Sequence, residues 1–178
     1  MKTKPPLTAN DSAYIGQVLT TMGECVSAGL SRFSGWMLVG FAAILGALLA
    51  NLDATAEFLA TGTLSTIAVL FSGAVFLNVL QRYSAAIVSS SAEVAKKVRE
   101  QPVPEGIAIG VLLEQLESAT LWPARLMVRR SNRKILAGDF AAGGRLISTF
   151  AQIEAWFVFA QVLISVTATW VLAYGLRG

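Results

Sequence analysis

The strongest chemical signal in the sequence is a cluster of basic residues in its second half. Five cations fall within ten residues, and no acidic residue lies between Glu117 and Asp139. The cluster consists of Arg125, Arg129, Arg130, Arg133 and Lys134. On a helix, the three arginines that recur every four residues share one face. Guanidinium groups bind phosphate through two hydrogen bonds at once, so the cluster predicts a site for an anion such as a nucleotide, an oligonucleotide or a lipid headgroup.

A simpler interpretation of the basic cluster needs no ligand. Cations beside a membrane span determine its orientation and contact anionic lipid, at about 1 kcal/mol per residue near the surface. Trp122 and Phe140 flank the cluster and could stack on a nucleic-acid base. The phosphate-binding motifs GxxxxGK[ST] and GxGxxG are absent from the sequence. Both interpretations stay open at this point.

Polar residues also recur along two apolar segments. Gln161, Ser165 and Thr169 follow one another every four residues. The other set consists of Ser65, Ser72 and Asn78. Amides and hydroxyls in lipid face another helix or a water-filled cavity. These residues therefore predict either interhelical hydrogen bonds or the lining of an uncharged pore.

A third segment carries small residues at helical spacing. Ala42, Gly46 and Ala50 are four residues apart. Small side chains let helix backbones approach closely in a membrane. We therefore predict a helix-packing face here, within the chain or between subunits.

Several catalytic and metal-binding chemistries are excluded by residue type. The chain has no His and one Cys, Cys25. Imidazole catalysis, an intrachain disulfide and a Cys/His zinc site are therefore impossible. The pair Glu114 and Glu117 has no third carboxylate nearby. We expect a protein that is not an enzyme and that has no cofactor and no metal site.

The composition indicates where these residues are placed. Apolar residues make up 54% of the chain and charged residues 14%, whereas soluble domains carry about 45–50% and 25%. Uncharged runs of 20, 24 and 22 residues separate Arg32 from Asp53, Glu57 from Arg82, and Glu154 from Arg177. The following aromatic residues lie near the ends of these runs, where rings prefer the headgroup zone: Trp36, Trp156, Trp170 and Tyr174. A helix of about 20 apolar residues crosses a bilayer. The sequence thus predicts an all-α membrane protein with three transmembrane helices.

The predicted segments, in chain order, are a cytoplasmic N-terminal amphipathic helix at 1–32, a first span at 33–52, an outer loop at 53–57, a second span at 58–81, a cytoplasmic helical region at 82–154, a third span at 155–176 and an outer tail at 177–178. Thirteen of the 14 basic residues lie in the first segment or in the cytoplasmic helical region, and only Arg177 lies outside them. The positive-inside rule places both segments in the cytoplasm. We expect a multi-pass protein of the inner (cytoplasmic) membrane with its N-terminus cytoplasmic and its C-terminus outside.

The N-terminal helix is expected at 12–33 from its apolar periodicity. The apolar residues that recur every four positions are Tyr14, Val18, Met22, Val26 and Leu30. Asn10, Asp11 or Ser12 could cap the start of this helix. We expect its apolar face to pack on the other cytoplasmic helices, with the membrane surface as the alternative.

The rest of the cytoplasmic region is expected to be helical as well. The second span should continue as one helix over 64–100, because nothing interrupts the pattern before the QPVPEG sequence. Two further helices are expected at 105–122 and 123–138. The second ends at Gly138, which suits a helix C-cap. Gly143 and Gly144 are a candidate hinge before the third span.

Three helices alone enclose no aqueous path, so the polar and small-residue faces favour a homo-oligomer. We predict a homo-oligomeric membrane channel or pore whose cytoplasmic basic residues bind an anionic nucleotide or oligonucleotide. Its partners would be membrane lipid, further copies of the chain and this ligand. The alternatives are a non-channel scaffold or anchor subunit of a larger complex and a holin-like lysis protein.

In span number, in the basic segment RLMVRRSNRK and in its lack of catalytic residues, the chain resembles the small multi-span membrane effectors of bacterial nucleotide-signalling anti-phage systems of the Hailong type. The resemblance implies a defence effector that opens the membrane when its cytoplasmic part meets a nucleotide or oligonucleotide. It assigns no role to an individual residue.

Overall fold

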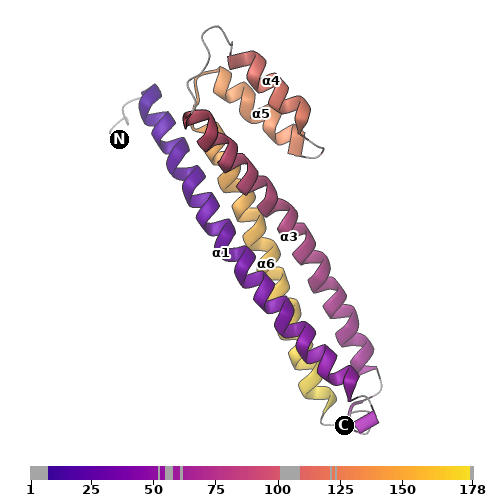
Figure 1. The fold of residues 1–178 in the computed structure, drawn as a ribbon. Helices are drawn as coiled ribbons and strands as arrows, with labels where there is room; N and C mark the ends of the chain where they lie inside the picture. Colours follow the sequence, from indigo (N-terminus) through magenta and orange to yellow (C-terminus); the bar gives the residue numbers. More distant parts are fainter. Residues whose placement is uncertain are drawn as a thin grey trace, which may run out of the picture. The chain divides into compact units, whose positions relative to one another are not determined.

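The computed structural model of the protein describes residues 8–51, 53–54, 58–60, 62–100, 109–120, 122 and 124–176. Within these residues every element longer than a turn is a helix (Figure 1). The labelled helices are α1 (Ala9–Ala50), α3 (Thr63–Glu100), α4 (Ile109–Ala119), α5 (Ala124–Leu136) and α6 (Ala142–Gly175). The predicted all-α class is therefore confirmed.

Parts of the predicted organisation lie outside the described residues. These parts are residues 1–7 of the N-terminal segment, Leu52 at the end of the first span, residues 55–57 of the outer loop, residue 61 of the second span, residues 101–108, 121 and 123 of the cytoplasmic region, and the tail at 177–178.

Three of the helices are long and apolar enough to cross a membrane: α1, α3 and α6. Only 17% of the residues in the most apolar 18-residue stretch of each helix are buried. The remaining apolar surface is too large to face water and needs lipid or protein to cover it. This is the architecture of a multi-pass membrane protein.

The chain divides into two compact units. The first, the mixed unit, consists of residues 1–26 and 87–151. The second, the three-helix unit, consists of residues 27–86 and 152–178. The three long helices each contribute one part to each unit.

The three-helix unit is held together by a small apolar core. Phe41 of α1, Ile67 of α3 and Ala168 of α6 are buried in one cluster. The ring of Phe41 packs edge-on against Phe71, with ring centroids 5.2 Å apart. Ala74 on α3 is fully buried, because its short side chain lets the neighbouring helices approach closely. The interior of this unit is therefore filled by side chains.

The second span starts later than predicted, because α3 begins at Thr63 and not at residue 58. Gly62 has a φ of +89°, a backbone conformation that residues other than glycine rarely adopt. The carbonyl of Gly62 accepts hydrogen bonds from Ser65 Oγ (2.8 Å) and Thr66 N (3.0 Å). This turn fixes the start of the helix.

The long helices cross several of the predicted boundaries. α3 runs on to Glu100 without a break, which confirms the continuous helix predicted over 64–100. α1 joins the predicted amphipathic helix and the first span into one helix of 42 residues. α6 begins at Ala142, well before the predicted start of the third span at residue 155.

α4 (Ile109–Ala119) and α5 (Ala124–Leu136) lie within the two predicted short helices, and residues 105–108, 121 and 123 of those predictions lie outside the described residues. The predicted glycine cap of α5 is confirmed. Gly138 has a φ of +92°, and its N–H donates to the Ile135 carbonyl at 2.9 Å. Asp139 N–H donates to the Lys134 carbonyl at 2.9 Å. These two bonds form the Schellman motif that satisfies the last carbonyls of a helix.

The cap at the start of α1 differs from the prediction, because it is Thr8 and not Asn10, Asp11 or Ser12. Thr8 Oγ1 accepts from the Asp11 N–H at 3.2 Å, and an Asp11 carboxylate oxygen accepts from the Thr8 N–H at 3.1 Å. This reciprocal arrangement is a capping box, with the acidic residue three positions into the helix.

The favoured packing of the apolar face of α1 on the other cytoplasmic helices is not seen within the described residues, and the membrane surface stays open as the alternative. Tyr14, which belongs to the apolar stripe, is 69% exposed, and the exposed residues of the same stripe include Val18, Met22 and Val26. The buried side carries Ser12, Gly16 and Thr20 instead. Ser12 Oγ accepts a hydrogen bond from the Ala141 N–H at 3.1 Å, just before α6. Backbones come so close here that only small side chains fit between them.

Gly143 and Gly144, the candidate hinge, lie inside the first turn of α6 and not in a break before it. A Cβ placed on Gly144 would overlap the backbone of Gly16 in α1. A Cβ on Gly143 would meet only Ile135 Cδ1, at 3.9 Å. Gly144 therefore provides a close contact between two helices of the mixed unit.

This contact predicts a difference between two neighbouring substitutions. Gly144→Ala should lower the free energy of unfolding by about 1–3 kcal/mol, because the backbone that the new methyl meets cannot move aside. Gly143→Ala should leave it unchanged or raise it by up to about 1 kcal/mol through helix propensity. Thermal unfolding of both detergent-solubilised variants, followed by circular dichroism, measures the difference. Equal midpoints would contradict the close contact.

Candidate functional site

The basic cluster lies on the exposed side of α5 in the mixed unit. α5 packs against α4 through its polar residue Asn132, whose Nδ2 donates to the Leu113 carbonyl at 3.0 Å. Ser131 is buried beside it. The five cations Arg125, Arg129, Arg130, Arg133 and Lys134 occupy the other sides of the helix and are exposed. Because α5 packs on α4 through its other side, the five cations stay exposed to solvent.

Most of this positive charge is not neutralised within the described part of the chain. Arg129 Nε lies 3.5 Å from Glu117 Oε1, and the two side chains are 56% and 22% exposed. A pair this open to solvent contributes little stability. Among the described residues, the other four cations have no carboxylate within 4 Å. The cluster can therefore bind an external anion without first breaking strong ion pairs.

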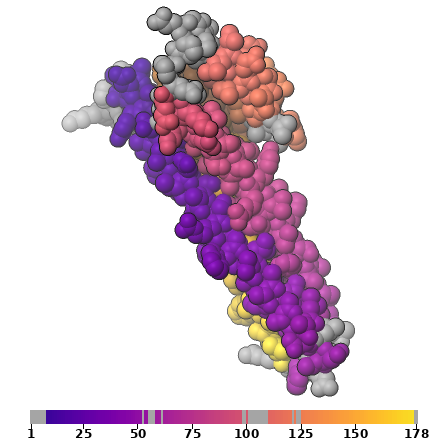
Figure 2. All heavy atoms as spheres, in the orientation of Figure 1, coloured from indigo at the N-terminus to yellow at the C-terminus, as the bar shows by residue number. Residues whose placement is uncertain are grey.

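The surface of α5 carries a shallow, open hollow of about 560 Å³. It is lined by Leu126, Arg129, Arg130, Arg133, Lys134 and Ala137. The atoms of α5, orange in Figure 2, form part of the visible surface. Trp122 is 79% exposed and Phe140 is exposed too, so both rings are accessible. Cations together with accessible rings suit a ligand that has both phosphates and bases.

The six polar residues of the apolar segments fall into two groups. Exposed hydroxyls donate back to a carbonyl of their own helix, as Ser72 does to Ala68 (3.0 Å) and Thr169 does to Ser165 (3.0 Å). Ser65 is exposed in the same way. The hydroxyl of the half-buried Ser165 also bonds within its helix.

The two amides meet inside the three-helix unit. Ser34 of α1 is fully buried and donates from Oγ to Gln161 Oε1 at 2.6 Å. Asn78 Nδ2 donates to the same Ser34 Oγ at 2.7 Å. One serine thus connects all three helices through the interhelical hydrogen bonds that the sequence allowed as an alternative. A pore-lining role for Gln161 or Asn78 would require these bonds to break, and for the exposed hydroxyls it stays a prediction.

Among the described residues of the three-helix unit, the small-residue face of α1 has no partner helix. Ala42, Gly46 and Ala50 are all exposed. Apart from its chain neighbours and the adjacent backbone of α1, no atom of the described residues lies within 4 Å of a Cβ placed on Gly46. If this face packs on protein, its partner is therefore another chain.

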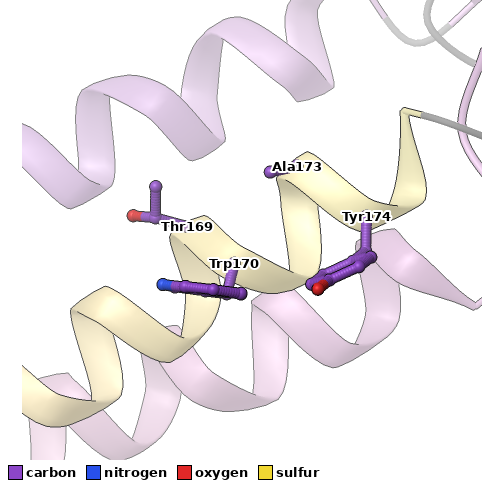
Figure 3. A pocket seen from close by; sticks show the side chains of 4 residues that line it. All are labelled: Thr169, Trp170, Ala173 and Tyr174. Carbon is purple, nitrogen blue, oxygen red and sulfur yellow. The ribbon is translucent and has the colours of Figure 1, made fainter.

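An aromatic pair marks the last turns of α6. The rings of Trp170 and Tyr174 lie along one face of the helix with centroids 5.7 Å apart, beside Thr169 and Ala173 (Figure 3). These four residues line an open hollow of about 350 Å³. Exposed Trp and Tyr rings at a helix end are typical of the membrane interface.

One buried group was missed by sequence reasoning. In the sequence, Glu154 only marks the start of the predicted third span. In the structure its side chain is 0% exposed. Ser27 Oγ lies 3.0 Å and 2.8 Å from its two carboxylate oxygens. The available signal was the series Ser27, Ser31 and Ser34 at helical spacing on α1. Hydroxyls repeated on one face of an apolar helix indicate a polar partner.

No group of three or more His, Cys, Asp or Glu residues that could hold a metal ion occurs within the described ranges. Comparison of the chain with protein-family models, curated proteins and solved structures gave no match.

Proposed function

We propose that the protein is a homo-oligomeric channel of the inner membrane that opens when an anionic ligand binds the basic face of α5. The proposed ligand is a nucleotide or an oligonucleotide, and the proposed role is that of a defence effector. In this proposal the N-terminus and the mixed unit are cytoplasmic and the C-terminus is outside, in accordance with the distribution of basic residues.

The observation that carries the proposal is the contrast between the interior and the surface of the three-helix unit. The interior is closed by side chains such as Phe41, Ile67 and Ala74. Any aqueous path must therefore run between copies of the chain. The outer surface offers the hydroxyls of Ser65 and Ser72 and the small-residue face of α1, instead of an unbroken apolar coat.

The exposed stripe of α1 supports assembly with further copies. Tyr14, Val18, Met22 and Val26 lie before the predicted first span, yet they are exposed on the isolated chain. Apolar side chains in a row outside the bilayer are stable only when another surface covers them. A symmetric oligomer supplies such a surface, because each copy presents the same stripe.

The second candidate is an anchor or scaffold subunit that conducts no ions. The hydrogen bonds of Gln161 and Asn78 to Ser34 favour it, because they consume the most polar groups of the spans inside one chain. In that case α5 would dock a protein partner or anionic lipid.

A two-step experiment separates these functions. The full chain, purified in detergent, should have the mass of an oligomer in multi-angle light scattering. In planar bilayers it should then give discrete conductance steps when ATP or a short single-stranded oligonucleotide is added. A stable monomer without conductance would overturn the proposal, and an oligomer that never conducts would favour the anchor.

A further inference from the structure

The buried carboxylate of Glu154 lies in a cluster of polar groups that the proposed anion site does not use. The Glu154 cluster consists of Ser27 and Ser31 on α1, Gln81 on α3 and Glu154 on α6, all within the three-helix unit. The polar side-chain atoms of the cluster are all oxygens, except for the amide nitrogen of Gln81.

The carboxylate of Glu154 is poorly satisfied by its neighbours. Ser27 Oγ is within hydrogen-bonding distance of both carboxylate oxygens, but its single hydrogen can serve only one of them at a time. Gln81 Nε2 is 3.5 Å from Glu154 Oε2, longer than an ordinary hydrogen bond. Among the described residues, no Lys or Arg nitrogen lies within 4 Å of this carboxylate. A buried carboxylate in this position needs a proton or another cation as its partner.

Gln81 provides an independent sign that a group is missing from the cluster. Its side chain is 0% exposed, and its Oε1 atom is buried without a hydrogen-bond donor in the described part of the chain. Its Nε2 donates to Ser31 Oγ at 2.9 Å. A buried acceptor without a donor is rare and costly. In this orientation the Gln81 carboxamide turns Nε2 toward Glu154 and leaves Oε1 without a donor among the described residues.

The distances suit a small cation. A half-turn of the Gln81 carboxamide exchanges Oε1 and Nε2, which brings Oε1 to about 3.5 Å from Glu154 Oε2. Oxygen ligands lie about 2.4 Å from a hard cation of the size of Ca²⁺ or Na⁺, so adjacent ligands at a right angle are about 3.4 Å apart. Ser27 Oγ and Ser31 Oγ are further oxygens beside the same carboxylate and amide.

We propose that Ser27, Ser31, Gln81 and Glu154 form a binding site for one hard monovalent cation, with Na⁺ as the probe. A monovalent ion neutralises the single carboxylate, whereas a divalent ion would leave a net positive charge buried. Carboxylate, amide and hydroxyl oxygens are the ligands that hard cations prefer. The bound ion would connect α1, α3 and α6 within one chain, independently of the proposed anion site.

The test is thermal unfolding of the purified full chain in detergent, in NaCl and in choline chloride of equal concentration near neutral pH. We expect the midpoint to rise with the logarithm of the Na⁺ concentration above the dissociation constant, by roughly 5 °C when Na⁺ is in about hundredfold excess over that constant. Glu154→Gln and Gln81→Leu should each abolish this Na⁺ dependence. The matched control is Glu93→Gln, which removes an exposed carboxylate of α3 that pairs with Lys97 and should leave the Na⁺ dependence intact.

The unaltered chain decides the proposal even if a variant fails to fold. Equal midpoints in Na⁺ and choline would overturn it. A midpoint that depends on pH but never on Na⁺ would assign a proton to Glu154 and would also overturn it. Radioactive Na⁺ binding by equilibrium dialysis is the second measurement, with one ion per chain expected for the unaltered protein. Ser31→Ala, a milder variant, should weaken that binding at least several-fold.

Discussion

Replacing Arg125, Arg129 and Arg133 by Gln is expected to lower the affinity for a single-stranded oligonucleotide about a thousandfold. Each arginine of this face can form a charge-assisted contact with phosphate, worth about 1.5–3 kcal/mol, and about 1.4 kcal/mol corresponds to a factor of ten. The salt dependence should change too, because each lost phosphate contact lowers the slope of log affinity against log salt by about 0.7. Fluorescence anisotropy with a labelled oligonucleotide, at about 50 and 200 mM salt, measures both effects.

The control removes the same number of charges elsewhere in the predicted cytoplasmic region. Lys96→Gln, Lys97→Gln and Arg99→Gln, combined in one chain, should leave binding within a few-fold of the unaltered protein. Membrane insertion should persist in both variants, because seven basic residues remain between the second and third spans. If the unaltered chain binds no oligonucleotide or nucleotide at any salt concentration, the cluster serves only as a determinant of orientation.

Ser34→Leu is expected to destabilise the three-helix unit by several kcal/mol. The larger side chain would enter a fully buried position, which costs about 1–3 kcal/mol in a packed interior. The substitution would also remove the partner of Gln161 and Asn78. An interhelical hydrogen bond in a membrane contributes about 0.6 kcal/mol, with a maximum near 1.7.

Ser72→Leu provides the matched control for this second prediction. Ser72 is exposed on α3, and its hydroxyl bonds only to the Ala68 carbonyl of its own helix. The same change at this position should therefore leave stability within about 0.5 kcal/mol. Unfolding of both variants by denaturing detergent, followed by circular dichroism, compares them. An equal loss of stability in the two variants would contradict the role of Ser34 in connecting the three helices by hydrogen bonds.

The sequence by itself determined the helical class, the three apolar helices, the uninterrupted course of α3 and the cap at Gly138. These features depend on local properties, namely the length of uncharged runs, the lack of helix breakers and the tolerance of glycine for positive φ. Local patterns survive in any tertiary arrangement, so they can be read along the chain.

Only the tertiary structure decided which faces are turned inward. Apolarity pointed to Tyr14 and Val18, but α1 buries Ser12 and Gly16 instead, because the size of side chains limits how closely the backbones of α1 and α6 approach. The hydrogen-bond partner of a buried polar side chain is likewise a residue far away in the sequence.

Gln161 and Asn78 gave the same sequence signal as Ser65 and Ser72, yet the amides converge on Ser34 while the two hydroxyls stay exposed. Glu154 itself gave no signal of burial, since it immediately precedes an apolar run. Its position opposite Ser27 arises from helix packing, which places two side chains 127 residues apart within hydrogen-bonding distance. A buried polar group is stable only with such partners, and the partners are known only once the helices are packed.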